Sequence, residues 1–94
     1  IDGLISLTGL LIASQLKKEV LDYCFPSHCS TEPGYRIVSD YLGLSPMLQM
    51  DMRLGEGSGC PLAFFLMESS VYTIEHMPTF EEGKLDRDDY VDIR

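Results

Sequence analysis

The segment that most constrains this chain is the glycine-rich run from Arg53 to Gly59, R-L-G-E-G-S-G, which leads directly into an apolar stretch. Its three alternating glycines permit positive φ angles and close backbone approach. Pro61 then suits the first turn of a helix, where its missing N–H is not needed. A glycine loop before a helix N-terminus offers free N–H groups at the positive end of the dipole, so the pattern predicts an open anion-binding loop. Glu56 is the anomaly, because a carboxylate is not expected beside a bound anion.

The same run is also compatible with a simple flexible connection. A G-x-G-x-G pattern without the lysine of a P-loop is a weak motif. The loop alone therefore leaves a functional and a purely connecting role open, and the remainder of the chain has to separate them.

The charge balance restricts the class of partner. The 94 residues include 15 acidic and 7 basic side chains, for a formal net charge of −8. Such a domain repels polyphosphate backbones, so we expect no nucleic-acid partner. A small phosphorylated ligand remains compatible with the sequence if the positive potential is local. Near the loop, only Arg53 and a helix N-terminus could supply that potential.

The cysteines point away from disulfides and metals. Cys24, Cys29 and Cys60 are odd in number, and no two of them have C-x-x-C spacing, so neither a disulfide framework nor a zinc ribbon is predicted. Cys24, His28 and Cys29 could be grouped as a metal cluster. We expect instead reduced thiols that behave as small apolar residues, with no metal and no cofactor.

The most apolar run, from Leu4 to Leu16, is interrupted by polar residues and is shorter than the roughly 20 residues of a membrane-spanning helix. No basic leader precedes it, so a signal peptide is not predicted. We expect a soluble, cytoplasmic protein that makes no membrane contact. Because the sequence starts at Ile1 with residues that are already apolar, we expect it to be a piece of a longer protein.

Hydrophobic spacing predicts three long helices. The first covers Leu4–Tyr23, and its first half is apolar on nearly all sides, as in a helix buried between other elements. The second covers Pro33–Leu42. The third covers Pro61–Met77. From Glu81 onward the chain is acidic and lacks apolar periodicity, so a poorly ordered tail is expected.

The ends of the second helix carry explicit signals. Ser30 or Thr31 is a natural N-cap, with Pro33 in the first turn. Gly43 suits the C′ position that follows the helix, and Leu44 is placed for the accompanying apolar contact.

The connections predict where a site would form. Tyr23–Phe25 could be a short buried strand, and Met47–Met52 a turn or a brief strand. Asp2-Gly3 and the segment from Ser27 to Ser30 lie where strands give way to helices, which is where open α/β sheets bind ligands. With the glycine loop, three polar junctions could converge on one site. The order of elements predicts a mostly helical piece of an α/β fold.

Four ordered motifs together resemble one family. They are I-D-G-L-I-S at the start, S-H-C-S-T-E-P-G-Y-R from Ser27, M-R-L-G-E-G-S-G from Met52 and M-P-T-F-E-E from Met77. From Asp2 to about Gly83 the chain resembles the C-terminal part of nicotinate-nucleotide:dimethylbenzimidazole phosphoribosyltransferases. The resemblance implies a C-terminal fragment of a Rossmann-like parallel-sheet fold, with residues 1–80 in the phosphoribosyltransferase domain and residues 81–94 as an acidic tail.

The resemblance implies a glycosyltransferase (pentosyltransferase) reaction of cobalamin biosynthesis. A phosphoribosyl group passes from nicotinate mononucleotide to a nitrogen of 5,6-dimethylbenzimidazole, giving alpha-ribazole 5′-phosphate and nicotinate. The glutamate of the R-L-G-E-G motif, here Glu56, is the general base in that family. A carboxylate fits this role, because the incoming base loses a proton as its other nitrogen attacks the ribose.

By the same resemblance, a set of substrate-binding residues surrounds the nucleotide, several of them through backbone groups: Asp2, Gly3, Ser30, Leu54 and Gly55. The implied partners are the two small-molecule substrates.

The sequence departs from the family at several positions. Family members commonly have histidine in place of Tyr35, and small residues in place of Cys60, Pro61, Phe64 and Phe65. Bulky residues after the loop could reshape the pocket for the aromatic base, so the base that is accepted stays open. The family's enzymes are several times longer than this chain, so we expect the isolated chain to be inactive.

A non-catalytic alternative also follows from the sequence. A truncated relative could act as a helical interaction module that docks through its apolar helices. Either way, the apolar surface predicts a homo-oligomer or association with the missing upstream half.

Overall fold

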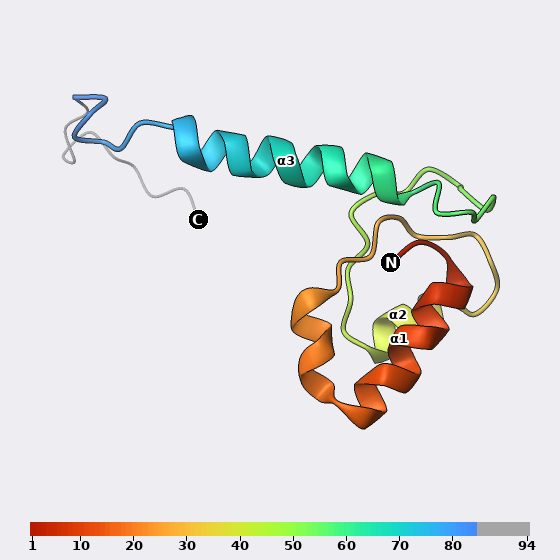
Figure 1. Cartoon of the computed structure of the whole chain (residues 1–94). Helices are drawn as coiled ribbons and strands as arrows, with labels where there is room; N and C mark the ends of the chain where they lie inside the picture. The colour runs from red at the N-terminus through yellow and green to blue at the C-terminus, as the bar shows by residue number, and fades with distance from the viewer. Residues whose placement is uncertain (85–94) are drawn as a thin grey trace.

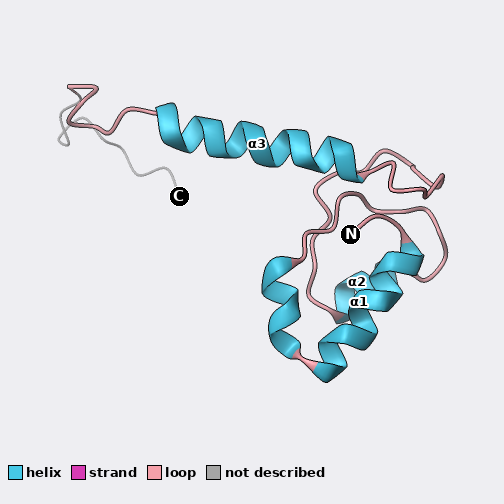
Figure 2. Cartoon of the chain, viewed as in Figure 1, coloured by secondary structure: helices cyan, strands magenta, loops and turns pink. Residues whose placement is uncertain are grey.

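The computed structural model describes residues 1–84, which form helices joined by long loops (Figures 1 and 2). The elements, in order, are α1 (Leu4–Leu16), the 3₁₀ helix η1 (Lys18–Tyr23), α2 (Tyr35–Tyr41) and α3 (Cys60–His76). Among residues 1–84, β-structure is limited to one isolated parallel bridge, between His28 and Leu48. The expected tail lies mostly outside the described residues.

The predicted continuous helix from Leu4 to Tyr23 is wrong, because the chain breaks at Lys17. Lys17 has extended backbone angles, φ −150° and ψ 107°, and the next six residues form η1. The break lets η1 fold back beside α1, where Val20 and Leu21 pack against the apolar core. A straight helix would carry these two side chains away from the core, so the gain from burying them opposes helix continuation.

The second predicted helix begins later than expected. Gly34 has φ +94°, a left-handed conformation, and α2 starts at the next residue. Pro33 therefore precedes the helix instead of occupying its first turn. The predicted N-cap is also wrong, since Gly34 is the cap. The Ser30 side chain instead accepts a hydrogen bond from the Glu32 amide at 3.3 Å.

The C-terminal end of α2 confirms the sequence prediction. Gly43 has φ +68°, and its amide donates to the Asp40 carbonyl at 3.1 Å. The Leu44 amide donates to the Ser39 carbonyl at 3.0 Å, which completes a Schellman motif. Leu44 packs against the core, as expected from the apolar contact that accompanies this motif.

Three extended segments lie side by side in the centre of the molecule. The Ser27 amide donates to the Ile1 carbonyl at 2.9 Å, and the Cys29 amide donates to the Leu48 carbonyl at 2.8 Å. Thr31 continues this pairing with Met52 at 3.1 Å. The predicted strand Tyr23–Phe25 is not formed. The pairing begins only at Phe25, whose carbonyl accepts a hydrogen bond from the Ile1 amine at 2.8 Å, and among residues 1–84 it stays too short to form a sheet.

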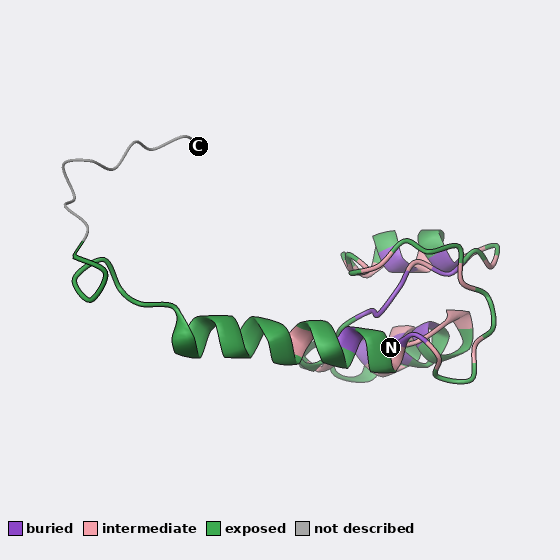
Figure 3. Ribbon diagram, turned by 90° about the horizontal axis from the view of Figure 1, so that it is seen from above, coloured by how far each residue is buried: buried purple, intermediate pink, exposed green. Residues whose placement is uncertain are grey.

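The third helix confirms the prediction for residues 61–77 to within one residue at each end, and it extends away from the other elements (Figure 1). Within residues 1–84, α3 packs on no other helix. Only its first turns approach the body, and Ala63 is buried there (Figure 3). The radius of gyration is 17.7 Å, whereas a compact domain of this length would have about 12 Å. The chain is therefore elongated.

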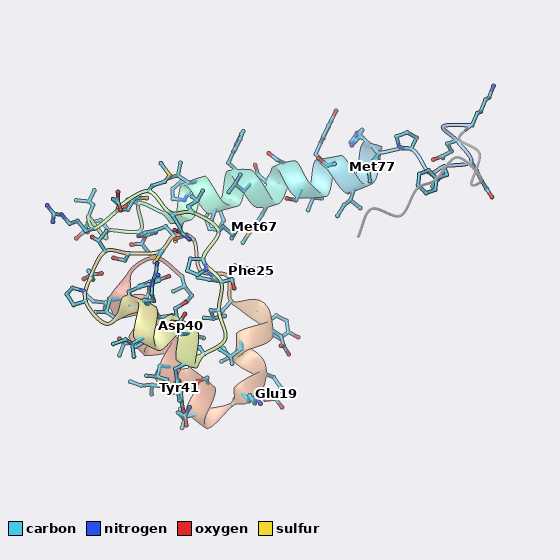
Figure 4. All side chains as sticks on the ribbon, turned by 180° about the vertical axis from the view of Figure 1, so that it is seen from behind. Glu19, Phe25, Asp40, Tyr41, Met67 and Met77 are labelled. Atoms are coloured by element: carbon cyan, nitrogen blue, oxygen red, sulfur yellow. The ribbon has the colours of Figure 1, made fainter. Side chains whose placement is uncertain are left out.

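The exposed side chains of α3 are largely apolar. They project from all sides of the helix along its length, past Met67 and as far as Met77 at its end (Figure 4). The large ones are Leu62, Phe64, Phe65, Leu66, Val71, Tyr72 and Ile74. Even so, none of the helices in residues 1–84 has the combination of length and hydropathy needed to cross a lipid bilayer.

The core is small and is centred on Leu7, Leu10 and Tyr35. Tyr35 is fully buried, and its ring stacks on His28 with centroids 6.4 Å apart and an interplanar angle of 14°. Within residues 1–84 its hydroxyl has no hydrogen-bond partner. Burial, together with the nearby Cys29 and Asp2, raises the pKa of Tyr35 from 10.0 to about 12.

This raised pKa predicts an alkaline loss of stability. The folded chain holds the Tyr35 proton more tightly than the unfolded chain. The contribution of this group to the free energy of unfolding is therefore fully present below about pH 10. It is lost at roughly 1.4 kcal/mol per pH unit as the pH rises toward the folded pKa of about 12. We expect Tyr35→Phe to remove this loss and to cost little at neutral pH, because the hydroxyl has no partner among the described residues.

Urea unfolding midpoints measured between about pH 8 and about pH 11.5 test this expectation. Tyr23→Phe is the matched control, because Tyr23 is 82% exposed and should keep the alkaline loss of the wild type. An equal loss in Tyr35→Phe and the wild type would contradict the assignment.

Candidate functional site

The glycine loop has an unusual backbone. Gly55, Glu56 and Gly57 have φ angles of 72°, 56° and 73°, three consecutive residues in the left-handed region. Glycine adopts this conformation freely, but for Glu56 it costs about 1–2 kcal/mol. Glu56 lies inside a turn closed by the Ser58 amide, which donates to the Gly55 carbonyl, and a second turn follows, in which the Cys60 amide donates to the Gly57 carbonyl. The carboxylate is thus carried at the tip of a tight loop.

The prediction that the amides of this loop are open to an external anion is wrong for Gly57, Ser58 and Gly59. The Asp2 carboxylate accepts hydrogen bonds from the Gly57 amide at 3.1 Å and from the Gly59 amide at 2.9 Å. These contacts place an internal anion at the N-terminus of α3, where the helix dipole favours negative charge. Hydrogen bonds to a charged acceptor contribute about 1.5–3 kcal/mol each, enough to offset the strain at Glu56.

A buried histidine lies behind this contact. His28 is 1% exposed, and its Nδ1 lies 3.0 Å from Ser27 Oγ and 3.8 Å from Asp2 Oδ1. The Gly59 backbone passes directly over the ring, so that a Cβ at position 59 would overlap His28 Nδ1 and come within 2.6 Å of Ser27 Oγ. The absence of a side chain at Gly59 is what allows the loop to approach the histidine.

A second internal carboxylate occupies the N-terminus of α1. Glu32 Oε2 accepts hydrogen bonds from the Leu4 amide and the Ser30 hydroxyl, both at 3.1 Å. Glu32 is a residue that the sequence did not predict as part of the site. The sequence feature that could have indicated it is its position two residues after Ser30, in the motif that starts at Ser27.

These contacts shape a cleft of about 480 Å³ between the start of α1 and the glycine loop. Its lining residues are Asp2, Gly3, Leu4, Ile5, Ser6, Glu32, Arg53, Leu54, Gly55, Glu56 and Gly57. An adjoining cleft of about 320 Å³ contains Cys29, Ser30, Arg36 and Asp51 and shares Glu32 with the first.

The structure therefore brings together most of the predicted site. Glu56, Asp2, Gly3, Leu54 and Gly55 line the same cleft, although Asp2 is 52 or more positions away from the loop residues. Ser30 lies in the adjoining cleft and is linked to the first by its hydrogen bond to Glu32. Two of the three junctions, Asp2-Gly3 and the glycine loop, line one cleft, and the third lies beside it, with His28 Nδ1 3.8 Å from Asp2 Oδ1.

The bulky residues that follow the loop lie elsewhere. Cys60, Pro61, Phe64 and Phe65 do not line the cleft formed by the described residues. Phe64 and Phe65 are 59% and 70% exposed on α3. Within residues 1–84 they therefore do not narrow the space beside Glu56.

The cysteines are all unpaired: Cys24, Cys29 and Cys60 are free thiols. Among the described residues, no group of three or more potential metal ligands comes together.

Comparison with known proteins supports the pattern of motifs. A family model described as phosphoribosyltransferase matches residues 1–85. The nicotinate-nucleotide–dimethylbenzimidazole phosphoribosyltransferase of Clostridium perfringens (strain ATCC 13124) is 46% identical over 94 residues, which are all of this chain and 26% of that protein. The Desulforamulus reducens protein of the same name is 51% identical over 83 residues, 88% of this chain and 24% of that protein.

A solved structure gives the same result. The crystal structure of the enzyme of that name from Thermus thermophilus matches with a TM-score of 0.83 and 40% identity. The match covers 92% of this chain and 26% of that one. The chain thus spans about a quarter of the length of the curated relatives it matches.

The close approach of Gly59 to His28 gives a testable prediction. Gly59 has φ −79°, which any residue can adopt, so the only obstacle to a side chain is space. We expect Gly59→Ala to lower the free energy of unfolding by about 1–3 kcal/mol through overpacking. The control is Gly9→Ala, because nothing lies within 4 Å of the added Cβ. This substitution should raise the free energy of unfolding by about 0.5–1 kcal/mol, since alanine favours the helix more than glycine does. Urea unfolding of both variants gives the comparison, and similar effects in the two would refute the prediction.

Proposed function

The chain belongs to the phosphoribosyltransferase family, and we propose that it forms the part of a nicotinate-nucleotide:dimethylbenzimidazole phosphoribosyltransferase that carries the general base. The observation that carries this proposal is the position of Glu56 on a cleft shared with the other predicted site residues. In the reaction, the bond from the ribose C1′ to the nicotinate nitrogen breaks. A new bond forms from C1′ to one nitrogen of the incoming benzimidazole.

Glu56 takes the proton from the other nitrogen of the base as this bond forms. A positioned carboxylate is suited to this step, because it accepts the proton as positive charge develops on the ring. Within the described residues, the Glu56 carboxylate has no hydrogen-bond or ion-pair partner, so its oxygens are available to the substrate. The tight loop restricts where the carboxylate can be, which lowers the entropic cost of reaching the reactive geometry.

The nucleotide would lie against the remaining residues of the cleft. Asp2, Gly3, Leu54 and Gly55 line it, and Ser30 borders it from the adjoining cleft. Two of these residues are glycines, which favours contact through backbone groups. We propose that these five residues bind nicotinate mononucleotide and its ribose, Asp2 through its backbone because both of its carboxylate oxygens accept hydrogen bonds from the loop.

The charge of the cleft indicates that the site is completed by other residues. It contains the carboxylates of Asp2, Glu32 and Glu56 and a single cation, Arg53. A nucleotide phosphate would be repelled by this surface unless further positive charge were supplied. We propose that residues outside this chain bind the phosphate, and that the isolated chain is inactive for that reason.

The setting in the whole protein is also a proposal. The paired extended segments around His28 and Leu48 support a place at the edge of a Rossmann-like parallel sheet, with residues 1–80 in the phosphoribosyltransferase domain. The unpaired cysteines agree with a cytoplasmic location.

The exposed α3 surface predicts association. We expect the 94-residue chain to self-associate or to bind a separately produced upstream segment of the same protein, because apolar patches of this kind rarely remain free. Light scattering with and without the upstream segment measures both outcomes. A monodisperse monomer in both samples would contradict this expectation. Association without nucleotide binding in the reassembled pair would favour the alternative, an interaction module.

Replacing the proposed base tests the catalytic role. In the full-length enzyme, Glu56→Gln should lower kcat by about 10²–10⁴, because the amide keeps the size of the side chain but cannot accept the proton. The affinity for nicotinate mononucleotide should change little. Glu68→Gln is the control, since Glu68 is exposed on α3 away from the cleft. Turnover of Glu56→Gln within about twofold of wild type would end the assignment.

A further inference from the structure

We propose that Asp2 is a positioning residue for Glu56, acting through the two loop amides that its carboxylate binds. The proposal rests on the proposed role of Glu56 as the general base. It assigns the Asp2 carboxylate a function different from substrate contact, since its oxygens are already engaged by the protein.

The geometry links the Asp2 carboxylate to the residue next to the base. Asp2 Oδ2 binds the amide of Gly57, which follows Glu56 directly, and Oδ1 binds the amide of Gly59. The two oxygens thus bind the amides of the residues before and after Ser58. These hydrogen bonds stabilise the left-handed turn that contains Glu56. Glu56 itself makes no contact that would fix the loop within residues 1–84, so its orientation depends on the amides beside it.

Asp2 is anchored on its other side. Its own amide donates to Ser6 Oγ at 3.0 Å, and Ser6 Oγ donates to the Gly3 carbonyl at 3.0 Å in the first turn of α1. His28 Nδ1 lies 3.8 Å from Asp2 Oδ1 and is held in place by burial and by Ser27. Asp2 is therefore held at the start of α1 and beside His28, and the glycine loop is hydrogen-bonded to Asp2.

Asp2→Asn should weaken the hydrogen bonds to the loop amides and reduce turnover. In Asp2→Asn one acceptor oxygen becomes an NH₂ group, which would face a loop N–H with like polarity. The loop should detach on that side, and Glu56 should spend less time at the reactive position. The other lining residues still bind the nucleotide, so kcat should fall while KM for nicotinate mononucleotide changes little.

A double-mutant cycle in the full-length enzyme tests the proposal. We expect Asp2→Asn to lower kcat about 10- to 100-fold, with KM for nicotinate mononucleotide within about threefold of wild type. In the Glu56→Gln background, Asp2→Asn should have no further effect beyond about twofold, because no base remains to be positioned. Hydrogen exchange at the amides of Gly57 and Gly59 should be faster in Asp2→Asn.

Two further variants complete the design. Glu32→Gln changes the matching carboxylate at the N-terminus of α1, whose hydrogen bonds among residues 1–84 go to Leu4 and Ser30 and not to the glycine loop. Its effect should multiply with that of Glu56→Gln. If Asp2→Asn does not fold, Asp2→Glu keeps both acceptor oxygens with one added methylene. It should show a smaller kcat loss that again vanishes in the Glu56→Gln background.

The outcomes separate the two proposals. A loss of kcat in Asp2→Asn that multiplies with the loss in Glu56→Gln, or a change confined to KM, overturns the positioning role and leaves the base in place. Normal turnover in Glu56→Gln overturns the base assignment, and the positioning role with it.

Discussion

The carboxylate of Asp2 and the amides of Gly57 and Gly59 form the contact on which the site depends. It joins two parts of the chain that are more than fifty residues apart. Closing a loop of that length has an entropic cost, which a charge-assisted pair of hydrogen bonds helps to offset. The contact also determines where the glycine loop lies relative to the start of α1. The cleft between these two segments exists because the contact holds them together.

Both major helix N-termini at this site are occupied by carboxylates of the chain itself. Asp2 accepts from amides at the start of α3, and Glu32 accepts from the Leu4 amide at the start of α1. The favourable end of each helix dipole is therefore used for internal structure. A glycine-rich loop before a helix suggests anion binding, but here the loop serves to present a carboxylate. Glu56 is compatible with this loop because the anion bound by the amides lies on the protein side.

Some features of the fold were predictable because they are local. The limits of α3 follow from Pro61 and from apolar spacing, and the end of α2 follows from Gly43, which provides the left-handed residue of the Schellman motif. The order of elements also predicted that Asp2-Gly3 and the glycine loop would lie near each other, and they line one cleft. By contrast, the break at Lys17 depends on burial of Val20 and Leu21 against the core, and such tertiary packing overrides helix propensity.

Other features could not be read from the pattern because their causes lie in distant contacts. The loop motif gave no sign that its amides would be occupied by Asp2, since the two segments meet only in the folded chain. Glu32 was missed for a similar reason, because its partner amide belongs to Leu4. The predicted strand at Tyr23–Phe25 failed because strand formation requires neighbours. Among the described residues, the pairings involve only the last residue of that segment, Phe25, and continue through Ser27, Cys29 and Thr31.

The loop around Glu56 depends less on the remainder of the protein than α3 and the charge of the cleft do. Among residues 1–84, the hydrogen bonds that set the backbone around Glu56 join residues between 2 and 60, so this chain itself supplies them. The described residues leave most of α3 exposed, and under the proposed function the positive charge for a nucleotide phosphate comes from outside them. A segment of this kind can preserve the orientation of a catalytic group while leaving substrate charge and helix packing to the remainder of the protein. Loss of activity in the isolated chain would then report a missing phosphate site and not a misplaced base.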